Sequence, residues 1–404
     1  MIIDETKTPG RCFDMREQLE PRRITNAMWD YSWLRGHYPG GPFEDWDRAL
    51  DDLLKRRFNT VRIDAYPHIV GREGATRYFQ PAAPLLNWGF STVDCEHDCA
   101  AALVEFVGKC QQRGIWVILS TWSAKEVDIP EDATGEARFQ PLWTAWERTL
   151  DLLAEHDLLG SILYVDFDQE FPYFSNLQPL LATLGQAETK VPLGDDEAMA
   201  AAGQRDGSGA QLAWNPAQMK LVSEYFSSTC RHFQIRYPAL RFTFSLTGFW
   251  HEVRAMNLKV FDVLELHIWM HSPRFDERTG FNRITKNRGA HDYKDYMRRI
   301  SETFQSMRPM CMQAMHNQMR DAQAWSREIA APLITTEAWG PWWHMDHPDL
   351  DWSWLRDWCE TCMAASPDYD FWGITPWNFS HPYWSHWEDV AWYERVNQRF
   401  LESV

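Results

Sequence analysis

Short apolar or β-branched runs alternate with amphipathic helical segments along the whole of this 404-residue chain. Such alternation indicates parallel strands that are joined by helical crossovers. We predict eight strands, at residues 23–29, 60–65, 115–121, 161–167, 241–246, 263–268, 333–336 and 371–376. Eight strand-then-helix units close most naturally into a (β/α)8 TIM barrel. An open doubly wound sheet would normally carry a glycine turn for a nucleotide after its first strand, and residues 26–31 contain none.

The helices between these strands are predicted from their apolar faces and end signals. Gly114 suits a helix C-terminus, and Asn215-Pro216 suits a helix start. The predicted helices cover residues 43–57, 93–113, 142–155, 290–307, 313–329, 351–364 and 385–401, with another that starts at Asn215. We therefore expect residues 1–404 to form one barrel domain, with an insertion at about 168–213 and long loops on its C-terminal face.

Charge limits the partners of this chain. It carries 40 Lys and Arg against 57 Asp and Glu, a formal net charge of −17. This charge repels phosphate backbones and anionic membrane surfaces, so neither nucleic acid nor a membrane is expected as a partner. The N-terminus has charged residues where a signal peptide would have an apolar core, which indicates a cytoplasmic protein. A carbohydrate or a neutral small molecule fits the charge, and a homo-oligomer stays open.

The cysteines do not form a metal pattern. All eight are scattered, and we expect reduced thiols. Cys359 and Cys362 form a lone Cys-x-x-Cys inside a predicted helix, with no second pair at zinc-like spacing. We therefore predict neither a bound metal nor a cofactor.

The C-terminal ends of barrel strands form the active face of this fold. The residues there are carboxylates, tryptophans, histidines, amides and one arginine: Trp29, Asp30, Arg62, Asp64, Tyr66, Trp122, Asp168, Gln169, Glu170, Trp250, His251, His267, Trp269, His271, Glu337, Trp339, Trp377 and Asn378. Glycoside cleavage needs two carboxyl groups, with aromatic and amide groups to hold the sugar. The chain has 23 tryptophans, whose flat faces suit the apolar faces of sugar rings.

Two glutamates stand directly at the ends of apolar strands. Glu170 closes the run Tyr-Val-Asp-Phe-Asp-Gln-Glu, and Glu337 closes Leu-Ile-Thr-Thr-Glu. A carboxylate in such a place needs a chemical task or a cationic partner. An ion pair with a neighbouring arginine or lysine is the alternative to catalysis for either residue.

On these residues the chain resembles clan A of the glycoside hydrolases, in its cellulase-like branch. The order of the predicted strands is similar over nearly the whole chain, but only a few residues match the motifs of the family. Gln169-Glu170 is similar to the Asn-Glu of the acid/base site, and Glu337 lies where the nucleophile strand ends. Arg62 is similar to the arginine that supports the nucleophile, and Trp377 to the tryptophan under the sugar at the cleavage point.

The resemblance implies a retaining glycoside hydrolase that acts by double displacement on a β-linked glycan or oligosaccharide. Glu337 would attack the anomeric carbon while Glu170 protonates the leaving oxygen and later activates water. The expected substrate contacts are Arg62, Trp29, Asp64, Trp122, Gln169, His267, Trp269, Trp339, Trp377 and Asn378. The chain departs from the family in two places: Gln169 replaces an asparagine, and His267 or Trp269 occupies the region of a strand-six tyrosine.

Other functions fit parts of the same pattern. His267 and His271 could serve a metal-dependent hydrolase or isomerase, and activity in a strong chelator would argue against it. A catalytically inactive glycan-binding barrel would have one glutamate misplaced or locked in an ion pair, and a transglycosidase would share every residue named above. Asp166 or Asp168 could replace Glu170 as the acid, although we expect one to pair with an arginine and the other to orient a neighbour.

Overall fold

The computed structural model describes most of the chain. The described residues are 21–82, 91–122, 127, 129, 133–185, 188–190, 211–247, 253–256, 258–270, 278, 290–340, 353–377, 380–382 and 384–403, with only the backbone described in 188–190, 211–213 and 290–297. Within this part of the chain, no helix combines the length and the apolar character that a membrane span requires. The cysteines in it are free thiols.

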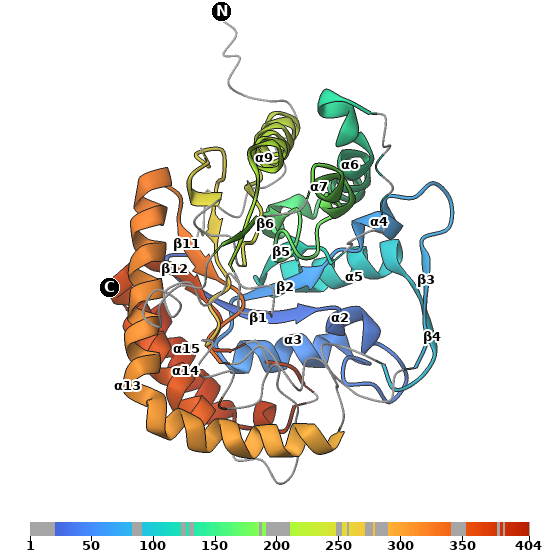
Figure 1. Cartoon of the computed structure of the whole chain (residues 1–404). Coiled ribbons are helices and arrows are strands. Elements are labelled where there is room, and N and C mark those ends of the chain that lie inside the picture. Colours follow the sequence, from blue (N-terminus) through green and yellow to red (C-terminus); the bar gives the residue numbers. More distant parts are fainter. Residues whose placement is uncertain are drawn as a thin grey trace, which may run out of the picture.

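Eight parallel strands form a nearly closed barrel with helices outside them (Figure 1). They are β1 (Ile24–Asp30), β2 (Thr60–Asp64), β5 (Trp116–Ser120), β6 (Ile162–Asp166), β9 (Phe242–Thr243), β10 (Leu264–Glu265), β11 (Leu333–Thr335) and β12 (Phe371–Ile374). Their order is β10-β11-β12-β1-β2-β5-β6-β9. The two outer strands, β9 and β10, meet just past β9. There the Leu246 N–H donates to the Glu265 carbonyl oxygen, and the His267 N–H donates to the Leu246 carbonyl oxygen. The predicted TIM barrel is confirmed.

Helices cover the outside of the barrel. They include α3 (Trp46–Lys55), α5 (Cys99–Gln112), α6 (Gln140–Glu155), α9 (Pro216–Arg236), α13 (Ala290–Ile329), α14 (Ser353–Ala365) and α15 (Val390–Leu401). The predicted start of α9 is confirmed, because the Asn215 side chain accepts the amides of Ala217 and Gln218 in a capping box. Short helices α2 (Ser32–Arg35), α4 (Pro67–Val70) and α7 (Gln178–Thr183) follow strands β1, β2 and β6.

Four predicted helices differ from the structure. The start of the segment predicted as a helix over 93–113 is instead β4 (Cys95–Asp98), which pairs antiparallel with β3 (Arg77–Gln80) before α5 begins. The stretches 290–307 and 313–329 are one helix, α13, which contains Pro309 and bends in Figure 1 as a proline inside a helix requires. The last predicted helix is divided at Asp389, whose side chain caps α15 through the Trp392 amide.

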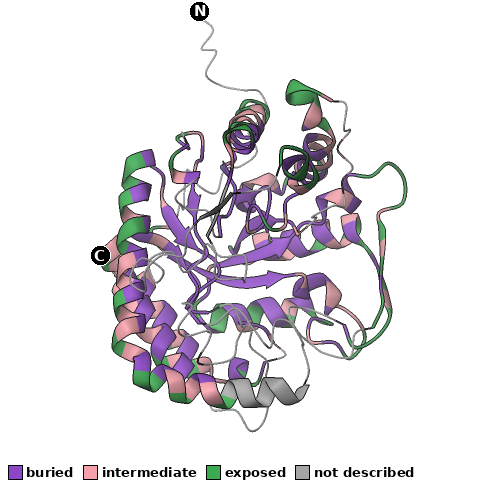
Figure 2. Ribbon diagram, viewed as in Figure 1, coloured by how far each residue is buried: buried purple, intermediate pink, exposed green. Residues whose placement is uncertain are grey.

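Alternate residues of each strand face opposite sides of the barrel wall. Ala27 and Trp29 of β1, and Val61 and Ile63 of β2, join the large apolar core between strands and helices. The residues between them therefore face the barrel interior, which is buried throughout the strands (Figure 2). Arg62 lies there, so the interior of this barrel is partly polar and charged.

The barrel wall is tightly packed at Gly373 of β12. A Cβ at Gly373 would lie 2.5 Å from Ile334 Cδ1 and 3.1 Å from Ile24 Cβ, on the two neighbouring strands. We expect Gly373→Ala to destabilise the fold by about 1–3 kcal/mol through overpacking. The matched control is Gly108→Ala on α5, where the nearest atom is 3.9 Å away and alanine favours the helix by up to about 1 kcal/mol. Denaturant unfolding measures both, and equal stabilities would contradict the packing argument.

Candidate active site

Arg62 lies at the centre of a charged cluster at the C-terminal end of the barrel. Its Nε and Nη2 donate to the two carboxylate oxygens of Asp30, each at 2.9 Å. Nη2 also donates to Glu337 Oε1, and Nη1 lies 3.3 Å from Glu265 Oε1. Residues from β1 and β2 thus meet residues from β10 and from the end of β11, across the barrel.

This guanidinium is fully buried, and only carboxylates can balance its charge there. Burial by itself lowers the pKa of Arg62, but the charges of Asp30, Glu337 and Glu265 outweigh burial and raise it well above the ordinary value. Arg62 is therefore a permanent cation. It fixes the positions of three acids whose strands lie far apart in the sequence.

Glu337 follows β11 and is almost completely buried. Its Oε1 accepts hydrogen bonds from Arg62 and from the side-chain amide of Gln169. Ser120 donates to Gln169 Oε1 at 2.7 Å, which fixes the direction in which that amide points. Burial raises the pKa of Glu337 to about 7, while the positive charges of His267 and Arg62 act in the opposite direction.

Glu170 sits in the loop that follows β6. Its backbone has a φ of 50°, a left-handed conformation that is uncommon for any residue except glycine. Its amide donates to Ser245 Oγ at 2.9 Å, which holds this conformation in place. Such strain gathers at functional sites because surrounding contacts must maintain it. The side chain is 14% exposed and is thus more accessible than that of Glu337.

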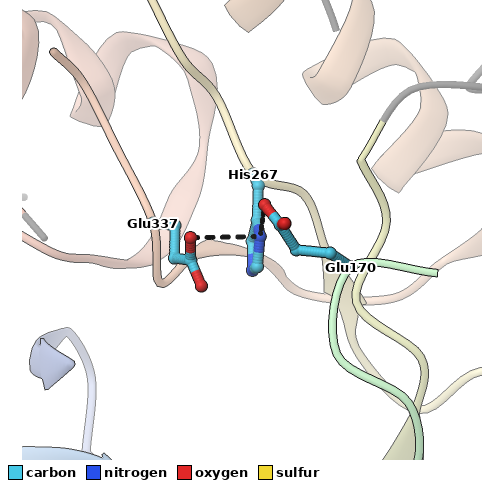
Figure 3. Close-up of side chains that lie close together, drawn as sticks. All are labelled: Glu170, His267 and Glu337. Atoms are coloured by element: carbon cyan, nitrogen blue, oxygen red, sulfur yellow. Dashed lines mark hydrogen bonds and ion pairs between the residues drawn. The ribbon is translucent and has the colours of Figure 1, made fainter. Parts of the chain in front are cut away.

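His267 lies between the two glutamates (Figure 3). Its Nδ1 is 3.0 Å from Glu170 Oε1 and 3.7 Å from Glu337 Oε2. One oxygen of each glutamate and one His267 nitrogen lie within 4.8 Å of one another. Trp269, two residues further along, places its Nε1 at 3.4 Å from Glu170 Oε1.

Burial opposes a charge on His267, but nearby carboxylates favour it. The charge of Glu337, with hydrogen bonds to Glu170 and Glu265, raises the pKa of His267 to about 10. Arg62 Nη1 lies 3.0 Å from the Nε2 atom. This raised pKa favours the protonated form of His267, an imidazolium beside the two glutamates.

The same three side chains have the spacing of a metal site, since Glu170, His267 and Glu337 each offer one ligand atom. The guanidinium of Arg62 in contact with both His267 and Glu337 makes this place unfavourable for a divalent cation. His271, the second histidine of the metal-dependent alternative, lies outside the described residues.

Asp64 and Trp122 lie beside the charged cluster. The Trp122 indole donates to Asp30 Oδ2 at 3.1 Å, and its backbone amide donates to Asp64 Oδ2 at 3.0 Å. Asp64 Oδ1 accepts the Tyr66 amide at 2.7 Å. Burial raises the pKa of Asp64 to about 7, against the effect of these two amides.

The structure places three of the predicted sugar contacts within the packed core. Trp29, Trp339 and Trp377 are almost fully buried. Their indole nitrogens donate to Ser380 O, Thr375 O and Tyr393 Oη respectively. In the described residues these rings stabilise the C-terminal end of the barrel by packing. Asn378, Trp250 and His251 lie outside the described residues.

The expectation for Asp166 and Asp168 was partly wrong. Asp166 accepts the amide of Ser245 and the hydroxyl of Ser120, and Asp168 accepts the hydroxyls of Ser175 and Tyr225. Neither forms an ion pair with an arginine in the described part of the chain. Both acids orient neighbours, because hydroxyl and amide donors are the groups that the loops bring to them.

Sequence reasoning assigned no role to Glu265 or Thr336. The Thr336 hydroxyl bridges Arg62 and Glu265, and it lies 3.3 Å from His267 Nε2. The spacing of Glu265 could have revealed its place in the site. Glu265, His267 and Trp269 are two residues apart along one extended segment, so their side chains face the same side. Asp30 was noticed at its strand end, but not as the bidentate partner of Arg62.

Comparison with known proteins gives one family and several similar structures. The profile of the sugar-binding cellulase-like family matches residues 26–401. A protein of Parabacteroides distasonis, provisionally described as a glycoside hydrolase, is similar with a TM-score of 0.75 and 23% identity, over 95% of this chain and 94% of that one. No curated protein matches the chain.

Two further structures are more distant. A glycoside hydrolase family 5 mannosidase of Rhizomucor miehei aligns with a TM-score of 0.47 and 11% identity, over 95% of this chain and 94% of that one. An endo-β-1,4-mannanase of Thermotoga petrophila aligns with a TM-score of 0.48 and 10% identity, over 96% of this chain and 79% of that one.

The charge balance around Arg62 predicts a pH-dependent stability. Arg62→Met leaves Asp30, Glu265 and Glu337 buried with one cation fewer, at a cost of about 3–5 kcal/mol when they are ionised. Arg62 lowers the pKa of Glu265 and of Glu337, so both values rise in the folded variant. These glutamates then take up protons as the pH falls, and the loss becomes smaller. We expect the difference in Tm from wild type to be greater at pH 8 than at pH 5.

Arg56→Met is the matched control. Arg56 is also buried, but its guanidinium donates to the carbonyl oxygens of Trp387 and Asp52 rather than to carboxylates. Its loss should therefore be nearly independent of pH between 5 and 8. Parallel behaviour of the two variants would refute the charge-balance account.

Proposed function

The chain belongs to the sugar-binding cellulase-like family and is a glycoside hydrolase, and from this premise we propose that it cleaves a β-linked glycan with retention of anomeric configuration. The observation that carries this proposal is the short distance between Glu170 and Glu337. One carboxylate oxygen of Glu170 lies within 4.8 Å of one carboxylate oxygen of Glu337. Retaining enzymes hold their two carboxyl groups about 5–5.5 Å apart, whereas inverting enzymes leave room for a water between them.

Glu337 is the proposed nucleophile. Arg62 and Gln169 both bind its Oε1, so this oxygen is fixed and its charge is partly neutralised. Oε2 faces His267 Nδ1 at 3.7 Å, on the side where Glu170 lies. In this arrangement Oε2 attacks the anomeric carbon, and its lone pair forms the glycosyl ester while the bond to the leaving oxygen breaks.

Glu170 is the proposed acid/base. It is the more exposed glutamate, and His267 and Trp269 hold its Oε1. In the first step its proton passes to the leaving oxygen, so the leaving group departs as an alcohol. In the second step Glu170 takes a proton from water, and the resulting hydroxide attacks the anomeric carbon and releases Glu337 as a carboxylate.

Aryl glycosides separate the two proposed roles. We expect Glu337→Ala to lose at least about 10³-fold in kcat, with partial rescue by azide, because a small nucleophile can occupy the space of the lost carboxylate. Glu170→Ala should keep more activity on substrates whose leaving group is strongly acidic, because such a group needs no proton. Initial rates over a series of phenol leaving groups measure both effects.

Glu360→Gln is the matched control, since this glutamate lies on α14 at the surface and pairs with Arg395. It should retain wild-type rates. If Glu170→Ala and Glu337→Ala hydrolyse all substrates as fast as this control, the two assignments are wrong.

The acidic limb of the pH profile should report Glu337. Its pKa of about 7 means that the nucleophile is ionised above this pH, so kcat/KM should fall as the pH drops through about 7. The positive charge of His267 lowers this pKa. His267→Gln should therefore move the acidic limb to higher pH, by roughly one unit. A limb that stays in place or moves to lower pH would argue against a charged His267 beside the nucleophile.

A further inference from the structure

A separate pocket of about 340 Å³ opens beside the charged cluster, at the C-terminal ends of β1, β2 and β5. Glu170 and Glu337 do not line it. It adjoins the catalytic cluster through Trp122, which lines the pocket and donates its indole hydrogen to Asp30, the partner of Arg62. A ligand in this pocket would therefore lie next to a group bound at the two glutamates.

Arg35 lines the pocket, and its guanidinium is held by tyrosine side chains. Its guanidinium donates to the hydroxyls of Tyr66 and Tyr78, and it lies 4.2 Å from the centre of the Tyr31 ring. Among the described residues Arg35 forms no ion pair with a carboxylate. A half-buried cation that is held by phenols rather than by an ion pair is suited to receive an anion.

Two more arginines line the same pocket, Arg72 and Arg77. Arg77 pairs with Glu96 at 2.7 Å, whereas exposed Arg72 forms no ion pair with the carboxylates that the structure describes. Phe79, which also lines the pocket, has 61% of its surface exposed. This gathering of cations stands in a chain whose net charge is −17, so it is a local exception to the charge of the molecule.

Asp64 is the acidic residue of the pocket; it attracts Arg35 but forms no ion pair with an arginine of the described residues. Its two oxygens accept the backbone amides of Tyr66 and Trp122, so the carboxylate is turned toward the chain. Tyr66 has a φ of 49°, a strained conformation that this hydrogen bond helps to maintain. The Tyr66 hydroxyl accepts from Arg35 and keeps its own hydrogen for an acceptor.

We propose that this pocket binds an anionic sugar unit of the glycan substrate, through a carboxylate or a sulfate ester on the ring. The guanidinium groups of Arg35 and Arg72 hold the anion, and the aromatic rings of Trp122 and Phe79 contact the apolar faces of the sugar. The volume is that of a small ligand site rather than of a bare ion. The proposal rests on the proposed function, because it names the class of glycan that this glycoside hydrolase prefers.

Calorimetric titration tests the pocket without requiring turnover. Glucose, glucuronic acid and glucose 6-sulfate share one ring and differ at C6 in charge. We expect at least one of the two anionic sugars to bind about tenfold or more tightly than glucose, since a hydrogen bond to a charged group contributes that much. This preference should weaken as salt is added. Tighter binding of glucuronic acid identifies a carboxylate as the ligand group, and tighter binding of the sulfate identifies an ester.

Two variants test whether the preference for anionic sugars over glucose arises in this pocket. Arg72→Gln removes an exposed cation with little risk to the fold, and Arg35→Gln removes the half-buried one. Each should reduce the anionic preference by about tenfold. Arg395→Gln, which removes a surface arginine on α15, should keep the wild-type preference. Equal binding of glucose and both anionic sugars, or a preference that survives both pocket variants, overturns the proposal.

The two proposals fail in different experiments. If aryl glycosides are cleaved as expected but the anionic sugars show no preference, the catalytic assignment stands and the pocket assignment falls. If Glu170→Ala and Glu337→Ala leave hydrolysis unchanged while Arg72→Gln abolishes anion preference, the pocket binds an anion but the catalytic assignment is wrong.

Discussion

The buried guanidinium of Arg62 is the interaction on which the rest of the site depends. Asp30, Glu265 and Glu337 come from three other parts of the barrel, and each contacts this one cation. Buried carboxylates would repel one another without it, and a buried cation would be equally costly without them. Closure of the barrel brings the four together, so the fold and the charge balance of the site support each other. Glu337 is thereby held in place before any substrate binds.

Strand ends were the predictable part of the site. Glu170 and Glu337 were named because apolar runs end at them, and Arg62 and His267 because they lie toward the C-terminal ends of predicted strands. The structure brings these four together. Trp29 was expected to contact the sugar, but its side chain faces the helices. Alternate side chains of a strand face opposite sides, so only the residues next to Trp29 face the barrel interior. A sequence shows where a strand begins and ends more clearly than it shows which alternate residues face the barrel interior. Glu265 was missed because the sequence did not show that its side chain faces the barrel interior.

Loops were the unpredictable part of the fold. Residues 93–98 look helical in sequence, but Cys95–Asp98 form β4 because β3 supplies a hydrogen-bonding partner that no local pattern reveals. The pocket beside the charged cluster depends on this hairpin, to which Tyr78 belongs, and on the segment after β1, where α2 ends at Arg35. Such segments have no periodicity, so their residues could not be placed together from the sequence.

Charge conservation explains how one rigid cluster can serve both steps of the proposed reaction. Before the first step Glu337 is a carboxylate and Glu170 carries a proton. After it Glu337 is a neutral ester, and Glu170 has become the carboxylate. His267 contacts both, at 3.0 Å from Glu170 and 3.7 Å from Glu337, so the negative charge moves from one neighbour of this imidazolium to the other. The net charge around Arg62 and His267 stays constant, and neither cation has to move or lose its proton while the sugar is transferred.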